Sequence, residues 1–197
     1  CAPLRRSALS PSSTSPLSIM IPVVVNVDPR ALFSQYDRDG SGKITARELQ
    51  DCLYNGTHKR FSLNTCRLLI GMGDYNCDGT CNYNEFLVLW RNLQGFLNLF
   101  TAFDRDRSGT IDRREMRTCL SQTGYRFSGA ESDQLVRMFS PRGQLAFDDF
   151  IQLNIIIATV SNAFRSKDTN GNGIVAFSNS EFAVTVTNLI VRLGSTR

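Results

Sequence analysis

The stretch DRDGSGKITARE, Asp37 to Glu48, has oxygen-bearing side chains at its first, third, fifth and ninth residues and a glutamate at its twelfth. Its sixth residue is Gly42. Alternate residues of a tight loop point to the same side, and glycine adopts the bend that follows them at little steric cost. Calcium takes six to eight oxygen ligands at about 2.4 Å, more than an ordinary turn supplies. The spacing therefore predicts a twelve-residue calcium loop between two helices.

Two more stretches repeat this pattern in full. They are DYNCDGTCNYNE, Asp74 to Glu85, and DRDRSGTIDRRE, Asp104 to Glu115. The eighth residue should face away from the ion, and it is isoleucine or cysteine in all three copies. Apolar residues at helical spacing flank each copy, so chance alignment of acidic surface turns is a poor explanation.

Each complete copy predicts ligands at positions 1, 3, 5, 7 and 12, the seventh through its backbone carbonyl. The predicted ligands are Asp37, Asp39, Ser41, Lys43 and Glu48 in the first loop, Asp74, Asn76, Asp78, Thr80 and Glu85 in the second, and Asp104, Asp106, Ser108, Thr110 and Glu115 in the third. The third loop has a fourth carboxylate, Asp112, and we expect it to bind calcium most tightly. Affinities on the order of 10⁻⁷ to 10⁻⁵ M are typical of calcium sensors.

The fourth copy, within MFSPRGQLAFDDF (138–150), keeps only part of the pattern. Its glycine, its apolar eighth residue and a final carboxylate, Asp149, are present. Met138, Ser140 and Arg142 stand where the first three ligands belong. We expect this loop to bind no calcium and the charge of Arg142 to enter its cavity.

The fifth copy, within KDTNGNGIVAFSNSEF (167–182), begins like a calcium loop but has Asn179 at its twelfth residue. Glu181 follows two residues later. Two readings stay open. Either the loop holds two extra residues and Glu181 closes it weakly, or the site is empty.

The spacing of the copies predicts an all-α fold of five helix–loop–helix units over residues 30–197. Eighteen residues with helical apolar periodicity separate Glu85 from Asp104, which predicts one helix of about 27 Å shared by two loops. Loops of this kind pair through short antiparallel contacts, so the first pairs with the second, the third with the fourth, and the fifth is left over. The unpaired fifth unit predicts a dimer interface on apolar residues. They are Val175, Phe182, Leu189 and Ile190.

The remaining composition argues against other classes of protein. The net charge is +4, without a basic block, which argues against nucleic-acid binding. Six cysteines form no paired framework, and the single histidine, His58, lies in a polar linker, so we expect reduced thiols, a cytoplasmic location and no enzymatic activity. Residues 1–29 form a Ser/Pro-rich and apolar tail that we expect to be largely disordered, and its apolar run is too short to span a bilayer.

Five such units after a Pro-containing tail resemble the penta-EF-hand family, over about residues 30–197. GYRFS (124–128), GQLAFDDFIQ (143–152) and FRSKDT (164–169) are most similar to the subgroup of the apoptosis-linked calcium sensor and peflin. The resemblance implies dimerisation through the fifth hand, with the same or another penta-EF-hand chain, and calcium-dependent binding of proline-rich segments of partner proteins, with membrane association through those partners on calcium loading. The positions that correspond to the partner pocket are Trp90, Phe96, Tyr125 and Arg126. Core packing is the alternative for Trp90.

The sequence thus predicts a calcium sensor and adaptor that exposes an apolar surface when calcium binds. Two alternatives remain, a calcium buffer without partners and a regulatory subunit of a calcium-dependent protease. Buffer-type units barely open on binding calcium, which separates them from sensors.

Overall fold

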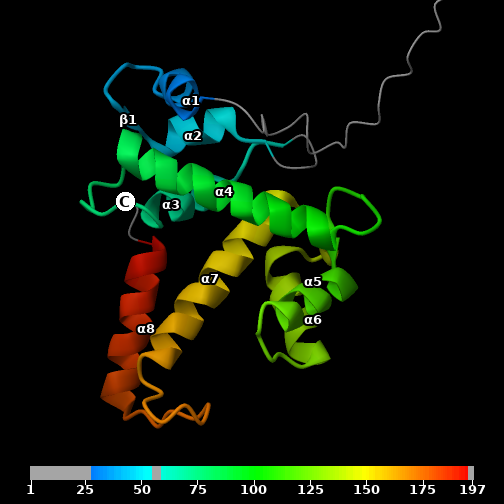
Figure 1. Ribbon diagram of the computed structural model, residues 1–197. Coiled ribbons are helices and arrows are strands. Elements are labelled where there is room, and N and C mark those ends of the chain that lie inside the picture. The colour runs from blue at the N-terminus through cyan, green and yellow to red at the C-terminus, as the bar shows by residue number, and fades with distance from the viewer. Residues whose placement is uncertain (1–27, 55–58, 195–197) are drawn as a thin grey trace, which may run out of the picture.

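The computed structural model describes residues 28–54 and 59–194, with side chains up to Ile190 (Figure 1). Most of the 1–29 tail and His58 therefore lie outside the described residues. In these ranges the fold has eight helices and four two-residue strands. The helices are α1 (Pro29–Tyr36), α2 (Ala46–Cys52), α3 (Leu63–Gly71), α4 (Tyr83–Phe103), α5 (Arg113–Gln122), α6 (Gly129–Phe139), α7 (Phe147–Arg165) and α8 (Asn179–Gly194); the strands are β1 (Lys43–Ile44), β2 (Cys81–Asn82), β3 (Ile111–Asp112) and β4 (Gln144–Leu145). The all-α prediction is confirmed, and no described helix is long and apolar enough to cross a membrane.

The helices that leave the first three loops begin at residues of the calcium pattern itself. Position 9 of each loop is the residue that caps the helix, and the position-12 glutamate is the third residue of the first turn. In α5, for example, the Asp112 side chain accepts from the backbone N–H of Glu115, and the Glu115 carboxylate accepts from the backbone N–H of Asp112. This reciprocal capping satisfies two N–H groups that a helix start otherwise leaves unpaired. The ligand spacing therefore also fixes where each helix begins.

The loops pair as the sequence predicts. Strand β1 pairs antiparallel with β2, and β3 pairs antiparallel with β4. The position-8 side chains of the paired loops are buried in the core. They are Ile44, Cys81, Ile111 and Leu145. In the described part of the chain the fifth loop, between α7 and α8, has no strand and pairs with no other loop (Figure 1).

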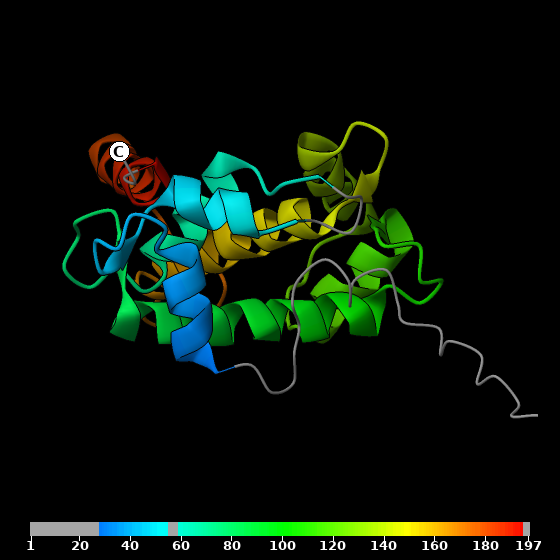
Figure 2. The same ribbon diagram turned by 90° about the horizontal axis from the view of Figure 1, so that it is seen from above.

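Two long helices connect the loops, as the 18-residue spacing predicts. Helix α4 has 21 residues and joins the second loop to the third, and α7 has 19 residues and joins the fourth to the fifth. Helix α8 then turns back beside α7 and also contacts α3, so the fifth unit packs against the first half of the chain (Figures 1 and 2). The fold is thereby a single body rather than two independent loop pairs.

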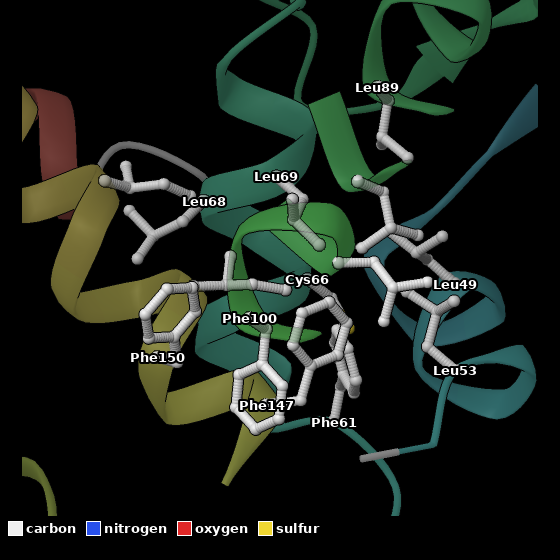
Figure 3. Close-up of a cluster of buried hydrophobic side chains, with 14 of the residues drawn as sticks. Leu49, Leu53, Phe61, Cys66, Leu68, Leu69, Leu89, Phe100, Phe147 and Phe150 are labelled. Carbon is white, nitrogen blue, oxygen red and sulfur yellow. The ribbon is translucent and has the colours of Figure 1, made fainter. Parts of the chain in front are cut away.

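The core joins these helices through aromatic rings. Phe100 of α4 meets Phe147 and Phe150 of α7 edge to face, with ring centroids 5.2 and 5.3 Å apart, and Phe61 meets Phe147 at 5.7 Å (Figure 3). All four rings are fully buried. Edge-to-face pairs add a modest attraction to the large apolar area that such rings bury. This cluster joins the two long helices, which have the second to fifth loops at their ends.

Candidate metal centres

The first half of each intact loop is folded around the position-1 carboxylate. Asp104 accepts from the backbone N–H groups of Ser108 and Gly109 at 2.9 and 3.0 Å. Asp37 accepts from positions 5 and 6 of its loop at 2.9 Å each, and Asp74 does the same at 3.2 and 2.9 Å. Position 6 has a positive φ, 78° at Gly109, which explains the glycine there. The loop backbone thus aims N–H groups at one acidic side chain.

The second half of each loop is held by the glutamate at position 12. The Glu115 carboxylate accepts from the backbone N–H of Arg105 at 2.8 Å and from that of Asp112 at 2.9 Å. Glu48 and Glu85 make the matching pair of bonds to positions 2 and 9 of their loops. Position 2 follows the entering helix, and position 12 belongs to the exit helix. One carboxylate therefore connects the ends of both helices.

Two loops gather their carboxylates closely enough to share one ion. The oxygens of Asp37, Asp39 and Glu48 lie within 4.8 Å of one another, and so do those of Asp104, Asp106 and Glu115. Asp104 is only 6% exposed, and burial raises the pKa of its carboxyl above its usual value. Like charges this close repel one another, and a divalent cation relieves that repulsion. The all-oxygen donor set suits calcium, so the chemistry of these sites fits the predicted ion.

The second loop has the same backbone hydrogen bonds but a different arrangement of charge. Its carboxylates, Asp74, Asp78 and Glu85, are not among the described groups that converge within 4.8 Å. Asp78 instead accepts from the Lys43 ammonium of the first loop at 2.8 Å. This ion pair keeps the pKa of Asp78 well below its usual value. The second loop is folded as predicted, but one of its predicted ligands is paired with a cation.

The fourth loop keeps the calcium-loop shape without the ligands. Gly143 has a φ of 77°, and Leu145 at position 8 is fully buried against β3. Arg142 is exposed, and the entry of its charge into the cavity stays a prediction. The guanidinium of Arg113, from the paired third loop, lies beside Gly143, 2.6–2.9 Å from where a Cβ on that glycine would be. Asp149, the one carboxylate at a ligand position of this loop, is half-buried, and burial raises the pKa of its carboxyl to about 6.

The fifth loop is half of a calcium loop. Asp168 accepts from the backbone N–H groups of Asn172 and Gly173 at 3.2 and 2.8 Å, as in the intact loops. Glu181 and Ser178 cap the start of α8 reciprocally, so Glu181 takes the place of the missing glutamate at Asn179 after two extra residues. However, the backbone N–H of Thr169, at position 2, bonds to Lys167 rather than to Glu181. The two ends of this loop are therefore not connected as they are in the first three loops.

The residues of the predicted partner pocket lie in two different environments. Trp90 is 6% exposed and stacks against Phe86 in the core, as the core-packing alternative for this residue predicts. Phe96 is partly buried on the same helix. Tyr125 is half-buried and stacks on Phe127, a ring that is 39% exposed and that the sequence did not single out. Arg126 is exposed. Of the predicted pocket residues, Tyr125 thus forms a partly exposed ring pair with Phe127.

The buried cysteines are poor nucleophiles. Burial raises the pKa of Cys66 and Cys81 to about 12 and that of Cys119 to about 11. At neutral pH these thiols are protonated, and the thiolate is the reactive form. Their position in the core gives them a packing role.

Comparisons with known proteins agree with this geometry. Residues 30–91 match the family described as an EF-hand domain pair, and residues 95–125 match an EF-hand domain. The chain is 38% identical over 145 residues to sorcin of Mus musculus, covering 72% of this chain and 73% of sorcin. It is 38% identical over 165 residues to peflin of Danio rerio, covering 82% of this chain and 61% of peflin.

One solved structure has a closely similar fold. A homolog of programmed cell death 6 protein from Leishmania major Friedlin superposes with a TM-score of 0.72 at 31% identity, covering 83% of this chain and 94% of that one. Identity does not separate the sorcin and peflin relatives, although the peflin match extends over more of the chain. The subgroup therefore stays a prediction.

Helix–loop–helix units with paired loops and clustered carboxylates define an EF-hand calcium-binding protein. Five copies of the unit are present, four of them in two pairs. The chain belongs to the penta-EF-hand family.

Proposed function

We propose that the protein is a non-enzymatic calcium sensor that recruits partner proteins when its first and third loops are loaded. The observation that carries this proposal is that the position-12 glutamate of each loop bonds to the ends of both of its helices. Glu48 and Glu115 each divide their two oxygens between the ends of the entering and exit helices. Calcium takes the same oxygens in a bidentate contact. Calcium binding to either loop therefore replaces hydrogen bonds that fix the relative position of its entering and exit helices.

A movement of these helices would change the exposure of nearby apolar side chains. Helix α5 leaves the third loop, and the Tyr125–Phe127 ring pair follows it directly. Calcium sensors of this type open a helix pair and expose an apolar groove. Proline-rich segments fit grooves lined with aromatic rings because they are already extended. We therefore propose the Tyr125–Phe127 region as part of the docking surface.

The test is a hydrophobic-dye titration of the full chain. We expect anilinonaphthalene sulfonate fluorescence to rise on adding calcium and not on adding the same concentration of magnesium. Glu115→Gln should remove most of the rise, because the third loop carries the largest acidic set. A flat dye signal in a chain that demonstrably binds calcium would contradict the sensor and favour a buffer.

We also propose that the fifth unit forms a dimer interface. Its loop has no partner loop in the described chain, and Phe182, Val184 and Ile190 of α8 are 57%, 60% and 64% exposed. The other two predicted interface residues, Val175 and Leu189, are half-buried. Apolar side chains gathered on one exposed helix are typical of an interaction surface. A second copy of the same unit would complete the loop pairing through a two-fold axis.

Sedimentation equilibrium tests this interface. We expect the full chain to be dimeric at micromolar concentration and the Phe182→Glu, Ile190→Glu double variant to be monomeric, since two charges would be buried without partners. Met138→Glu is the matched control, because Met138 is 71% exposed at the end of α6, outside the proposed interface. A monomeric wild-type chain in both calcium states would contradict a homodimer.

A further inference from the structure

Lys43 is the one positively charged residue at position 7 of the five loops. The corresponding residues of the other copies are Thr80, Thr110, Gln144 and Ile174. Position 7 gives calcium its backbone carbonyl, so its side chain is not committed to its own loop. In the β1–β2 pair Lys43 lies directly opposite Asn82, which is position 9 of the second loop. The pairing of the loops therefore places a cation from the first loop beside the second.

The ammonium of Lys43 contacts a predicted calcium ligand. Its Nζ donates to Oδ2 of Asp78 at 2.8 Å, and the Asn76 amide donates to the same oxygen at 3.1 Å. The other oxygen of Asp78 accepts from the backbone N–H of Thr80 at 2.8 Å. Both oxygens are thus engaged, one of them by a full positive charge. In the first and third loops a serine stands at this position, so only the second loop has this ion pair.

The second loop differs from the first and third loops at positions 3 and 5. Asp74 and Glu85 make the same backbone hydrogen bonds as their counterparts in the intact loops. Position 3 is Asn76 where those loops have Asp39 and Asp106, so a cluster of three carboxylates at positions 1, 3 and 12 cannot form, and Asp78 at position 5 is paired with Lys43. The pair is partly solvent-exposed, with side chains 49% and 29% exposed, so an incoming ion can reach it.

We propose that Lys43 is an internal competitor for calcium in the second loop and makes that loop the weakest of the three and the last to fill. The proposal rests on the calcium site that the sequence predicts in the second loop. An ion entering there must either displace the ammonium from Asp78 or bind beside a like charge. Either way the competition is electrostatic, and salt screens it because the pair is exposed.

Calorimetric calcium titration of the full chain tests this role. Lys43→Met keeps the backbone carbonyl and removes the charge. We expect the weakest binding phase to tighten by roughly five- to tenfold, because a like charge a few ångströms from a divalent ion is removed. Lys43→Arg should keep the wild-type affinity, and raising the salt concentration from 0.05 to 0.5 M should shrink the gain of Lys43→Met.

Two controls assign the effect to the second loop. Arg47→Met removes an exposed cation from position 11 of the same first loop and leaves the Lys43–Asp78 pair in place, so the weak phase should stay within about twofold. Adding Glu85→Gln to Lys43→Met should abolish the gain. An unchanged or weakened phase in Lys43→Met, or an equal gain in Arg47→Met, would overturn the proposal. If Glu85→Gln changes nothing in either background, the second loop is no calcium site and the proposal fails with it, while calcium binding by the first and third loops would leave the sensor intact.

Discussion

Replacing Glu115 by glutamine is expected to lower the calcium affinity of the third loop by about 100-fold or more. Losing even an outer-shell partner of a metal ligand costs roughly 10- to 100-fold, and Glu115 is a proposed direct ligand. Glutamine can still accept the backbone N–H that caps α5, so the helix start should survive. What is lost is one negative charge and the bidentate grip on the ion. Calorimetry should show one tight phase fewer.

Glu131 provides the matched control for this variant. It caps the start of α6 through the same reciprocal bonds, with Ser128, but it belongs to no carboxylate cluster. Glu131→Gln should leave every calcium-binding phase unchanged. Equal affinity losses in both variants would mean that helix capping rather than metal ligation explains the effect, and the assignment of Glu115 would be wrong.

Replacing Phe100 by alanine should produce the largest loss of stability. Phe100 is fully buried, and its ring contacts Phe147 and Phe150 of α7 (Figure 3). A buried phenylalanine-to-alanine change costs about 3–5 kcal/mol, because apolar area is lost and the cavity closes only in part. Urea denaturation of the calcium-free chain measures this directly. The loss should also persist in calcium, since no loop ligand is touched.

The comparison variant is Phe127→Ala. Phe127 is 39% exposed and has one aromatic neighbour, so its removal should cost no more than about 1 kcal/mol. If Phe100→Ala costs as little, the Phe100 cluster does not join the two long helices as the structure describes.

The fold was predictable because residues of the calcium pattern also determine where helices begin and which loops pair. Position 9 caps the exit helix and position 12 supplies the reciprocal cap, so Asp112 and Glu115 specify a helix start as well as an ion site. The buried residue at position 8 specifies the pairing of loops, and the 18-residue spacing specifies α4. Each of these signals comes from residues that are close together in the sequence and have a fixed position in the repeat.

The parts that were not predictable depend on contacts between loops. The guanidinium of Arg113, from the third loop, lies against Gly143 of the fourth loop, a contact that the sequence did not indicate. Lys43 was considered only for its carbonyl, although its side chain contacts Asp78. Each contact follows from strand register, which places position 7 of one loop opposite position 9 of its partner. Knowing that register, a cation at position 7 would have been the signal for Lys43.

The fourth loop affects how steeply the protein responds to calcium concentration. It keeps Leu145 buried against the third loop and a bend at Gly143, but it lacks the side-chain ligands. The half of the molecule built on β3 and β4 is therefore expected to hold one calcium-binding loop beside a folded loop that binds none. A single site cannot be cooperative with an empty neighbour. We expect no cooperativity within this pair of loops, so that this half of the protein reports calcium as a graded signal rather than a threshold.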